Sequence, residues 1–162
     1  QKTAYEISTR DWSSDVCSSD LEIAGMIREL GFDAEILPDE PDTDTRISSR
    51  TNGIAWQIAM TGDGPFHLGI RARVPMWVRG DPFRWANEWN RHHWSQAFAA
   101  IDPDTNRPVA SGRTYMVGIE STLFFGSGVT PEYVVGFIDW WTDEVKALSE
   151  VPEVTFYEEL PQ

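Results

Sequence analysis

NGIAWQIAM (Asn52–Met60) and FHLGIRARV (Phe66–Val74) decide the fold, because apolar side chains occupy every second position in the strand part of each stretch. A strand sends successive side chains to opposite faces of its sheet, so this period of two predicts one face on a core and one face toward water. Asn-Gly at the start of the first stretch is typical of a tight two-residue hairpin turn. The sequence therefore predicts consecutive antiparallel strands at the centre of the chain.

Helical periodicity surrounds these strands. A short helix is expected at 21–30, ended by Gly31, which tolerates a left-handed conformation. A second helix follows Asp81-Pro82 and a third runs from Pro131 to about Ser149, each with a capping residue before the proline. The wide apolar face of the third helix consists of Val134, Phe137, Ile138, Trp141, Val145 and Leu148.

The remaining strands are expected at 33–37 and 46–50, and a second hairpin at 95–101 and 108–118, with 73–80 as a connection. The resulting order is α-β-β-β-β-α-β-β-α. Hairpins without βαβ alternation indicate the α+β class, with an antiparallel sheet and helices packed on one face.

The chain is strongly acidic, with a formal net charge of −13 over 162 residues. Such a charge repels phosphate backbones and anionic lipids, so we expect no nucleic acid and no membrane as partner. No apolar run approaches the roughly 20 residues of a membrane helix, and we expect a cytoplasmic domain.

QKTAYEI (Gln1–Ile7) and DWSSDVCSSDL (Asp11–Leu21) resemble the in-frame translation of a sequencing-library adapter. We therefore expect residues 1–21 to be non-native, disordered or adventitiously placed, with the native start missing. The only cysteine, Cys17, lies in this segment, so the rest offers no thiolate for zinc or catalysis. The domain proper is expected at 22–151, followed by an acidic tail at 152–162.

The segment Ala86–Arg91, followed by a hairpin and a helix opening at Val129–Glu132, resembles the YbjN family, which carries an N-x-W-N segment on its central helix. Asn87, Trp89 and Asn90 match that segment. The resemblance implies a fold similar to type III secretion chaperones and a role as a bacterial sensory transduction regulator. It implies no catalytic residues.

Two interpretations of the N-x-W-N segment remain open. In the structural one, which we favour, Trp89 lies in the core and the amides of Asn87 and Asn90 bind neighbouring backbone. In the functional one, the amides face a partner peptide.

A metal site is not expected, because adjacent His92 and His93 diverge on a helix and no zinc-binding spacing is present. No cofactor and no catalytic group are indicated either.

The chain is unusually rich in tryptophan, with eight residues. Interfaces are enriched in tryptophan, so Trp77, on the expected connection, and Trp140 are candidates for a partner surface together with Asn87 and Asn90. Alternatively, Trp56, Trp85 and Trp89 could line a pocket between sheet and helices.

Two functions follow. The favoured hypothesis is a non-catalytic regulatory or chaperone-like domain that binds a protein, with a homodimer through the last helix as one form of that binding. The alternative is a sensor that binds a small ligand in the tryptophan-lined pocket.

Deleting Gln1–Asp20 should leave the melting temperature nearly unchanged, because an adapter-derived segment has no native surface to bury. Thermal unfolding followed by circular dichroism measures this. A loss of several degrees would show that the segment docks on the domain.

Overall fold

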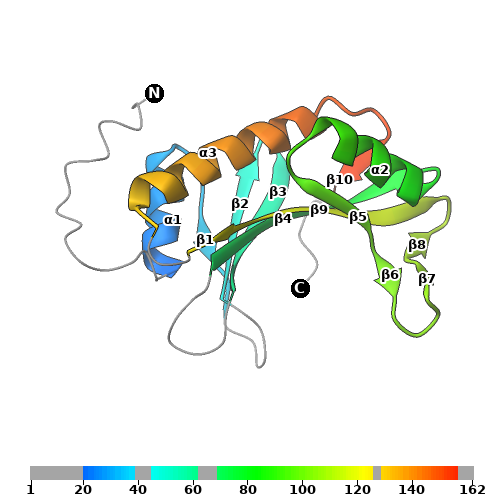
Figure 1. The fold of residues 1–162 in the computed structure, drawn as a ribbon, viewed down its shortest axis with the longest axis horizontal. Coiled ribbons are helices and arrows are strands. Elements are labelled where there is room, and N and C mark those ends of the chain that lie inside the picture. Colours follow the sequence, from blue (N-terminus) through cyan, green and yellow to red (C-terminus); the bar gives the residue numbers. More distant parts are fainter. Residues whose placement is uncertain (1–19, 39–44, 62–68, 126–128, 157–162) are drawn as a thin grey trace.

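The computed structural model describes residues 20–38, 45–61, 69–125 and 129–156. In this part of the chain, three helices cover one face of a large antiparallel sheet (Figure 1). They are α1 (Asp20–Glu29), α2 (Pro82–His92) and α3 (Pro131–Leu148). The expected α+β class, with its antiparallel sheet, is confirmed.

The main sheet has eight strands among the described residues, in the order β1-β2-β3-β4-β9-β5, with β10 paired to β4 and β8 paired to β9. All pairs are antiparallel. The strands are β1 (Glu35–Ile36), β2 (Arg46–Thr51), β3 (Ile54–Thr61), β4 (Gly69–Arg79), β5 (Gln96–Ala99), β8 (Ala110–Ser111), β9 (Thr114–Phe124) and β10 (Val154–Phe156). A separate ribbon pairs β6 (Ile101–Asp102) with β7 (Arg107–Pro108).

The core lies between the sheet and the helices, as the period of two predicts. On β3, Trp56 and Ile58 have no exposed surface, and on α3 the same holds for Ile138 and Trp141. The indole N–H of Trp56 donates to the hydroxyl of Thr51 at 3.0 Å, so this buried polar group is satisfied. The central part of the expected strand pattern is confirmed, while residues 66–68 lie outside the described residues.

Local signals end and cap the elements where the sequence predicts them. Gly31 has a φ of 90°, and the Phe32 N–H donates to the Ile27 carbonyl at 3.2 Å, which closes α1. Asn52-Gly53 turns with φ values of 51° and 81° between β2 and β3. The Asp81 carboxylate accepts from the first turn of α2, as an N-cap does.

The β4 strand is longer than the sequence suggests, and the expected connection at 73–80 is wrong. β4 continues to Arg79 and pairs with β9 over its whole length, from Gly69 opposite Phe124 to Arg79 opposite Thr114. Met76 and Val78 keep the alternation and are fully buried. Long apolar burial along this pair outweighs the proline at position 75 as a strand breaker.

The expected hairpin between 95–101 and 108–118 is correct at its tip, where Ile101 lies opposite Pro108, but its pairing beyond the tip differs from the expectation. The chain makes two turns here, and Gly112, with a φ of 62°, forms the second. β5 therefore pairs with the later half of β9, Gln96 opposite Glu120, while β6 pairs with β7. The predicted strand order is correct up to α2 and incomplete after it.

Both ends of the domain differ from expectation. α1 begins at Asp20, so its first turn takes in the last two residues of the adapter-like segment, whose residues 1–19 lie outside the described part. After α3 the chain forms β10, with Thr155 opposite Trp77 on β4, where the sequence suggests only an acidic tail. The Arg79 N–H donates to the Glu153 carbonyl beside this pair.

Gly69→Ala should destabilise the domain, because a Cβ there would lie 2.3 Å from the backbone carbonyl oxygen of Leu123. We expect a loss of about 2 kcal/mol in the free energy of unfolding, measured by urea denaturation. Gly136→Ala is the matched control, since its Cβ on α3 meets open space and removes a helical glycine. It should gain about 0.8 kcal/mol. Equal effects of the two substitutions would contradict the tight approach of β4 and β9.

Candidate binding surfaces

Trp89, at the centre of the N-x-W-N segment, is part of the core. It is 6% exposed, and its indole N–H donates to the Ser95 hydroxyl at 2.9 Å. The His93 ring stacks on the indole with centroids 3.6 Å apart and planes inclined by 7°. Trp89 thereby joins α2 to the chain that leads into β5.

Asn90 protects the edge of the sheet. Its side-chain oxygen accepts from the Ala97 N–H at 2.7 Å, and its amide nitrogen donates to the Ala97 carbonyl at 3.0 Å. β5 is the last strand on this side, and an edge strand presents unpaired backbone groups. The Asn90 amide therefore takes the place of a neighbouring strand at Ala97.

Glu144 links α3 to the segment between α2 and β5. Its carboxylate accepts from the Ser95 hydroxyl at 2.5 Å and lies 3.4 Å from Nδ1 of His93. The side chains of Glu144 and His93 are only 13% and 26% exposed. Because the Ser95 hydroxyl donates to the carboxylate and not to His93, this cluster lacks the serine-to-histidine hydrogen bond of a Ser-His-acid triad. It ties two helices together.

The other residues of the sequence-based hypotheses lie in separate places. Asn87 is exposed on α2, three residues before Asn90 and near the same helix face. Trp85 is half-buried and stacks on Trp89 at 5.6 Å, whereas Trp56 lies in the core beneath α3. The structure brings Trp85 and Trp89 together, with Trp56 elsewhere in the core. None of the three lines either of the two hollows described below.

Trp77 and Trp140 are both half-buried and lie on different elements. Trp77 belongs to β4, which lies between β9 and β10 at this position. Trp140 belongs to α3, and its ring centroid lies 5.8 Å from that of Phe137 on the same helix. The most exposed large apolar side chain of the described residues is Trp94, at 90%, in the turn after α2. Its position directly after the helix end, outside the buried stripe of α2, is the signal that could have identified it.

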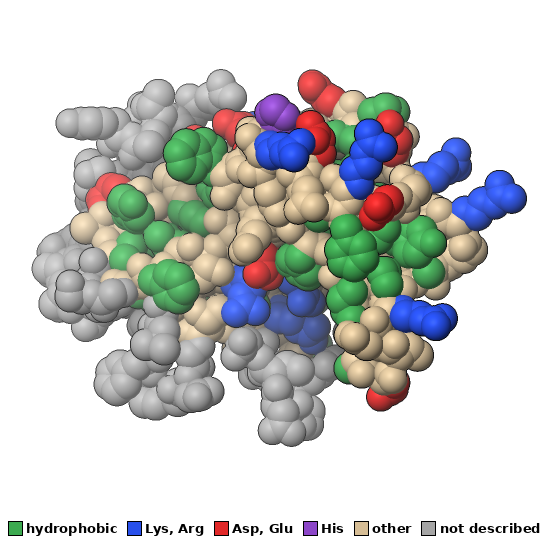
Figure 2. Space-filling view, turned by 45° about the vertical axis from the view of Figure 1, so that its right-hand side comes forward, with side chains coloured by type: hydrophobic (Ala, Val, Ile, Leu, Met, Phe, Trp, Pro, Cys, Tyr) green, Lys and Arg blue, Asp and Glu red, His purple; other side chains and the backbone are tan. Residues whose placement is uncertain are grey.

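An open groove of about 870 Å³ runs between the start of α2 and the strand ends of β7, β8 and β9. Its lining combines apolar and cationic side chains (Figure 2). The apolar side chains are Pro82, Phe83, Pro108, Ala110 and Tyr115, and the cationic ones are Arg79, Arg107 and Arg113. Sequence reasoning missed this groove, because its arginines come from three separate segments: the end of β4, β7, and the turn before β9.

The charge of the groove is positive although the chain is acidic. Asp81 is the only acidic residue among the described residues of its lining, and the carboxylate already accepts from the N–H groups of Phe83 and Arg84. Phe83 is 52% exposed. The groove can therefore hold an apolar group and pair carboxylates with guanidinium forks around it.

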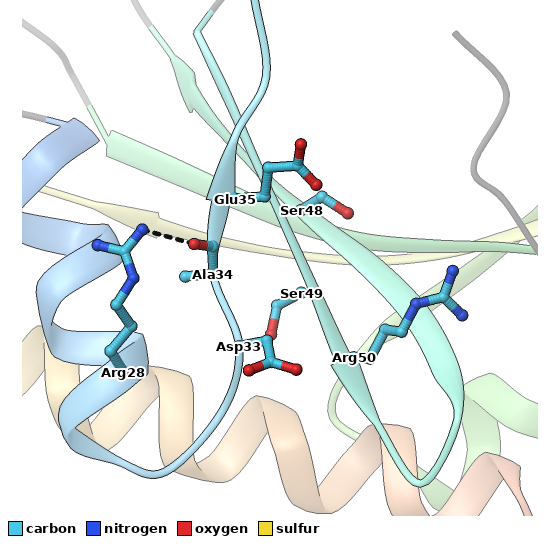
Figure 3. Close-up of a pocket in the computed structure, with 7 residues that line it drawn as sticks. All are labelled: Arg28, Asp33, Ala34, Glu35, Ser48, Ser49 and Arg50. Atoms are coloured by element: carbon cyan, nitrogen blue, oxygen red, sulfur yellow. Dashed lines mark hydrogen bonds between the residues drawn. The ribbon is translucent and has the colours of Figure 1, made fainter.

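A smaller hollow of about 350 Å³ lies where α1, β1 and β2 meet (Figure 3). The Arg28 guanidinium donates to the Ala34 carbonyl, and Arg50 points away from it on the far side. Asp33 and Glu35 add carboxylates between them. Because the two guanidiniums do not converge, this hollow offers no concentrated charge of either sign.

Two pKa values depart from the ordinary range. Burial, together with the charges of Arg46 and Arg71, lowers the pKa of Arg73. The exposed Glu132 has a lowered pKa because its own backbone N–H and the Thr130 hydroxyl bind the carboxylate. Neither group belongs to the groove.

Within the described ranges, no group of three or more His, Cys, Asp or Glu side chains is placed to hold a metal ion. The helices of that same part of the chain are too short or too polar to cross a bilayer.

A comparison with protein-family models matches residues 19–151 to a family described as "YbjN: Putative bacterial sensory transduction regulator". The match covers all three helices and every strand except β10. No curated protein matches the sequence.

Asn90→Ala should lower the free energy of unfolding by about 1–2 kcal/mol, because it removes both hydrogen bonds to Ala97. Asn87→Ala, on the same helix with an exposed side chain, is the control and should change it by less than about 0.5 kcal/mol. Urea denaturation measures both. If the two variants lose the same stability, the edge-protecting role of Asn90 is wrong.

Proposed function

Because the chain belongs to the YbjN family, we propose that it acts as a regulator by binding a partner protein and not by catalysing a reaction. The groove beside α2 is the proposed binding site. Its ligand is an acidic segment of the partner that carries an apolar side chain as anchor. The observation that carries the proposal is the gathering of three arginines around an apolar groove in a chain of charge −13.

The apolar part of the groove supports an anchor. Phe83 offers half of its surface to solvent, and Pro108 and Tyr115 face the same hollow. Interfaces concentrate their energy in a few buried aromatic and arginine side chains. An anchoring leucine or tryptophan would remove this surface from water, at roughly 25 cal/mol for each Å² buried.

The cationic part supports an acidic ligand. Arg79 is the last residue of β4, Arg107 belongs to β7, and Arg113 lies in the turn before β9, so three separate segments bring arginines to the groove. A segment with carboxylates on both sides of its anchor can pair with them, whereas a cationic segment is repelled. Because the rest of the chain is net negative and repels an acidic segment, electrostatic attraction favours binding of such a segment at this groove.

A fluorescein-labelled acidic peptide with a central Trp-Leu pair tests the proposal by fluorescence anisotropy. We expect saturable binding that falls about tenfold in Phe83→Ala and in Arg113→Glu, since each loses one part of the groove. A peptide with lysine in place of every acidic residue should not bind.

Matched controls lie elsewhere on the surface. Tyr133→Ala removes an exposed aromatic side chain of α3, and Arg91→Glu reverses an arginine of α2 that pairs with Glu88. Both should bind the acidic peptide as the wild type does. Equal losses in the groove variants and the controls would sink the assignment of the site, and failure of every peptide to bind would sink the proposed recognition of acidic segments.

A further inference from the structure

The face of the sheet opposite the helices carries a second cationic cluster. Side chains alternate along a strand, so the residues between the buried positions of β2, β3 and β4 share this outer face. The register places Arg46 and Arg71 on either side of Ala59, with Arg73 next to Gln57 one step along. Three arginines thus occupy neighbouring positions on this face, next to the small residue Ala59.

The cluster is held in place by a buried amide. Gln57 is 2% exposed, and its side-chain oxygen accepts from the Arg73 guanidinium at 3.4 Å. This contact orients Arg73 without neutralising it. Because the Gln57 amide is neutral, the positive charge of Arg73 stays available for an anion. A side chain that is already held in its binding conformation also loses less conformational entropy when the anion binds.

The arginines of the cluster repel one another. The pKa of Arg73 is lowered by burial first and then by the charges of Arg46 and Arg71, while Glu120 on β9 opposes this only in part. Across the described ranges, no carboxylate lies within ion-pair distance of Arg71 or Arg73. The close approach of like charges stores unfavourable energy that a bound anion would release.

We propose that Arg71 and Arg73, on the outer face of β4, form a binding site for the phosphoryl group of a small soluble phosphate compound, with Arg46 on β2 adding positive charge beside them. A phosphoryl group is compact and presents several oxygens, so it can accept hydrogen bonds from the guanidiniums of Arg71 and Arg73 at once. The cluster encloses Ala59 and Gln57 and provides no aromatic anchor of the kind found in the groove. This geometry favours a compact dianion over an extended peptide.

The site does not depend on the proposed function. It uses none of the residues that line the groove, so either binding event can be absent while the other remains. The space-filling view shows a compact group of Lys and Arg side chains apart from those at the right-hand end of the molecule (Figure 2).

Isothermal titration of the full chain with pyrophosphate at low salt tests the proposal. We expect saturable binding that weakens about tenfold in Arg71→Gln and in Arg73→Gln, and that weakens as salt is added. Arg91→Gln is the control, because this exposed arginine of α2 pairs with Glu88 far from the cluster along the chain. It should bind pyrophosphate as the wild type does. Acetate should not compete at equal concentration.

The free protein gives a second readout. Arg71→Gln should raise the melting temperature without ligand, since it relieves repulsion on Arg73, yet it should lose the further rise that pyrophosphate gives the wild type. Undiminished pyrophosphate binding by Arg71→Gln and Arg73→Gln would overturn the site. Absence of wild-type binding at ~10 mM pyrophosphate, or a phosphoserine peptide that binds much more tightly than free phosphoserine, would overturn the small-phosphate ligand.

Discussion

The pairing of β4 with β9 is the constraint on which the rest of the structure depends. It joins eleven residues of one strand to eleven of the other, and it brings together segments that are far apart in the sequence. Its inner side buries Val74 and Met76 from β4 and Val117 and Ile119 from β9 under the helices. Hydrophobic burial along this seam fixes the register, because a slip by one residue would turn these side chains to the outer face.

Both binding surfaces inherit their geometry from that register. At one end of the pair, Arg79 lies opposite Thr114, which brings the turn at Arg113 to the start of α2 and closes the groove. Toward the other end, the same strand presents Arg71 and Arg73 on its outer face. β4 thus contributes to both cationic sites, to the groove through its end and to the arginine cluster through its outer face.

The elements that depend on near neighbours could be predicted from the sequence, and those that depend on distant pairing could not. The Asn52-Gly53 turn and the Asp81 cap each involve a few adjacent residues, so the pattern is sufficient. Pro75 misleads because a proline in a central strand normally lacks a ladder hydrogen bond. Here β3 pairs with β4 only as far as Arg73, and β10 takes over at Met76, so the proline lies in the gap between them. No local pattern reveals that β10 fills this edge.

The same distinction explains the candidate sites. Tryptophan content drew attention to large aromatic side chains, yet helix phase and strand parity decide which of them are buried, and Trp89 falls on the inner stripe of α2. The groove needs arginines from three separate segments of the chain, which only the folded sheet brings together. One signal was present in the composition: among 13 cationic residues, only Lys2 and Lys146 are not arginine, and arginine is the residue suited to forked binding of anions.

The N-x-W-N segment therefore holds α2 and the edge strand in place and does not itself form either proposed site. Trp89 fixes α2 on the core and Asn90 closes the edge strand, while the groove and the outer arginine cluster use other residues. A change in the groove or the outer cluster can alter what the domain binds without disturbing the contacts of Trp89 and Asn90. The residues that hold this architecture are then different from the residues of the two proposed sites.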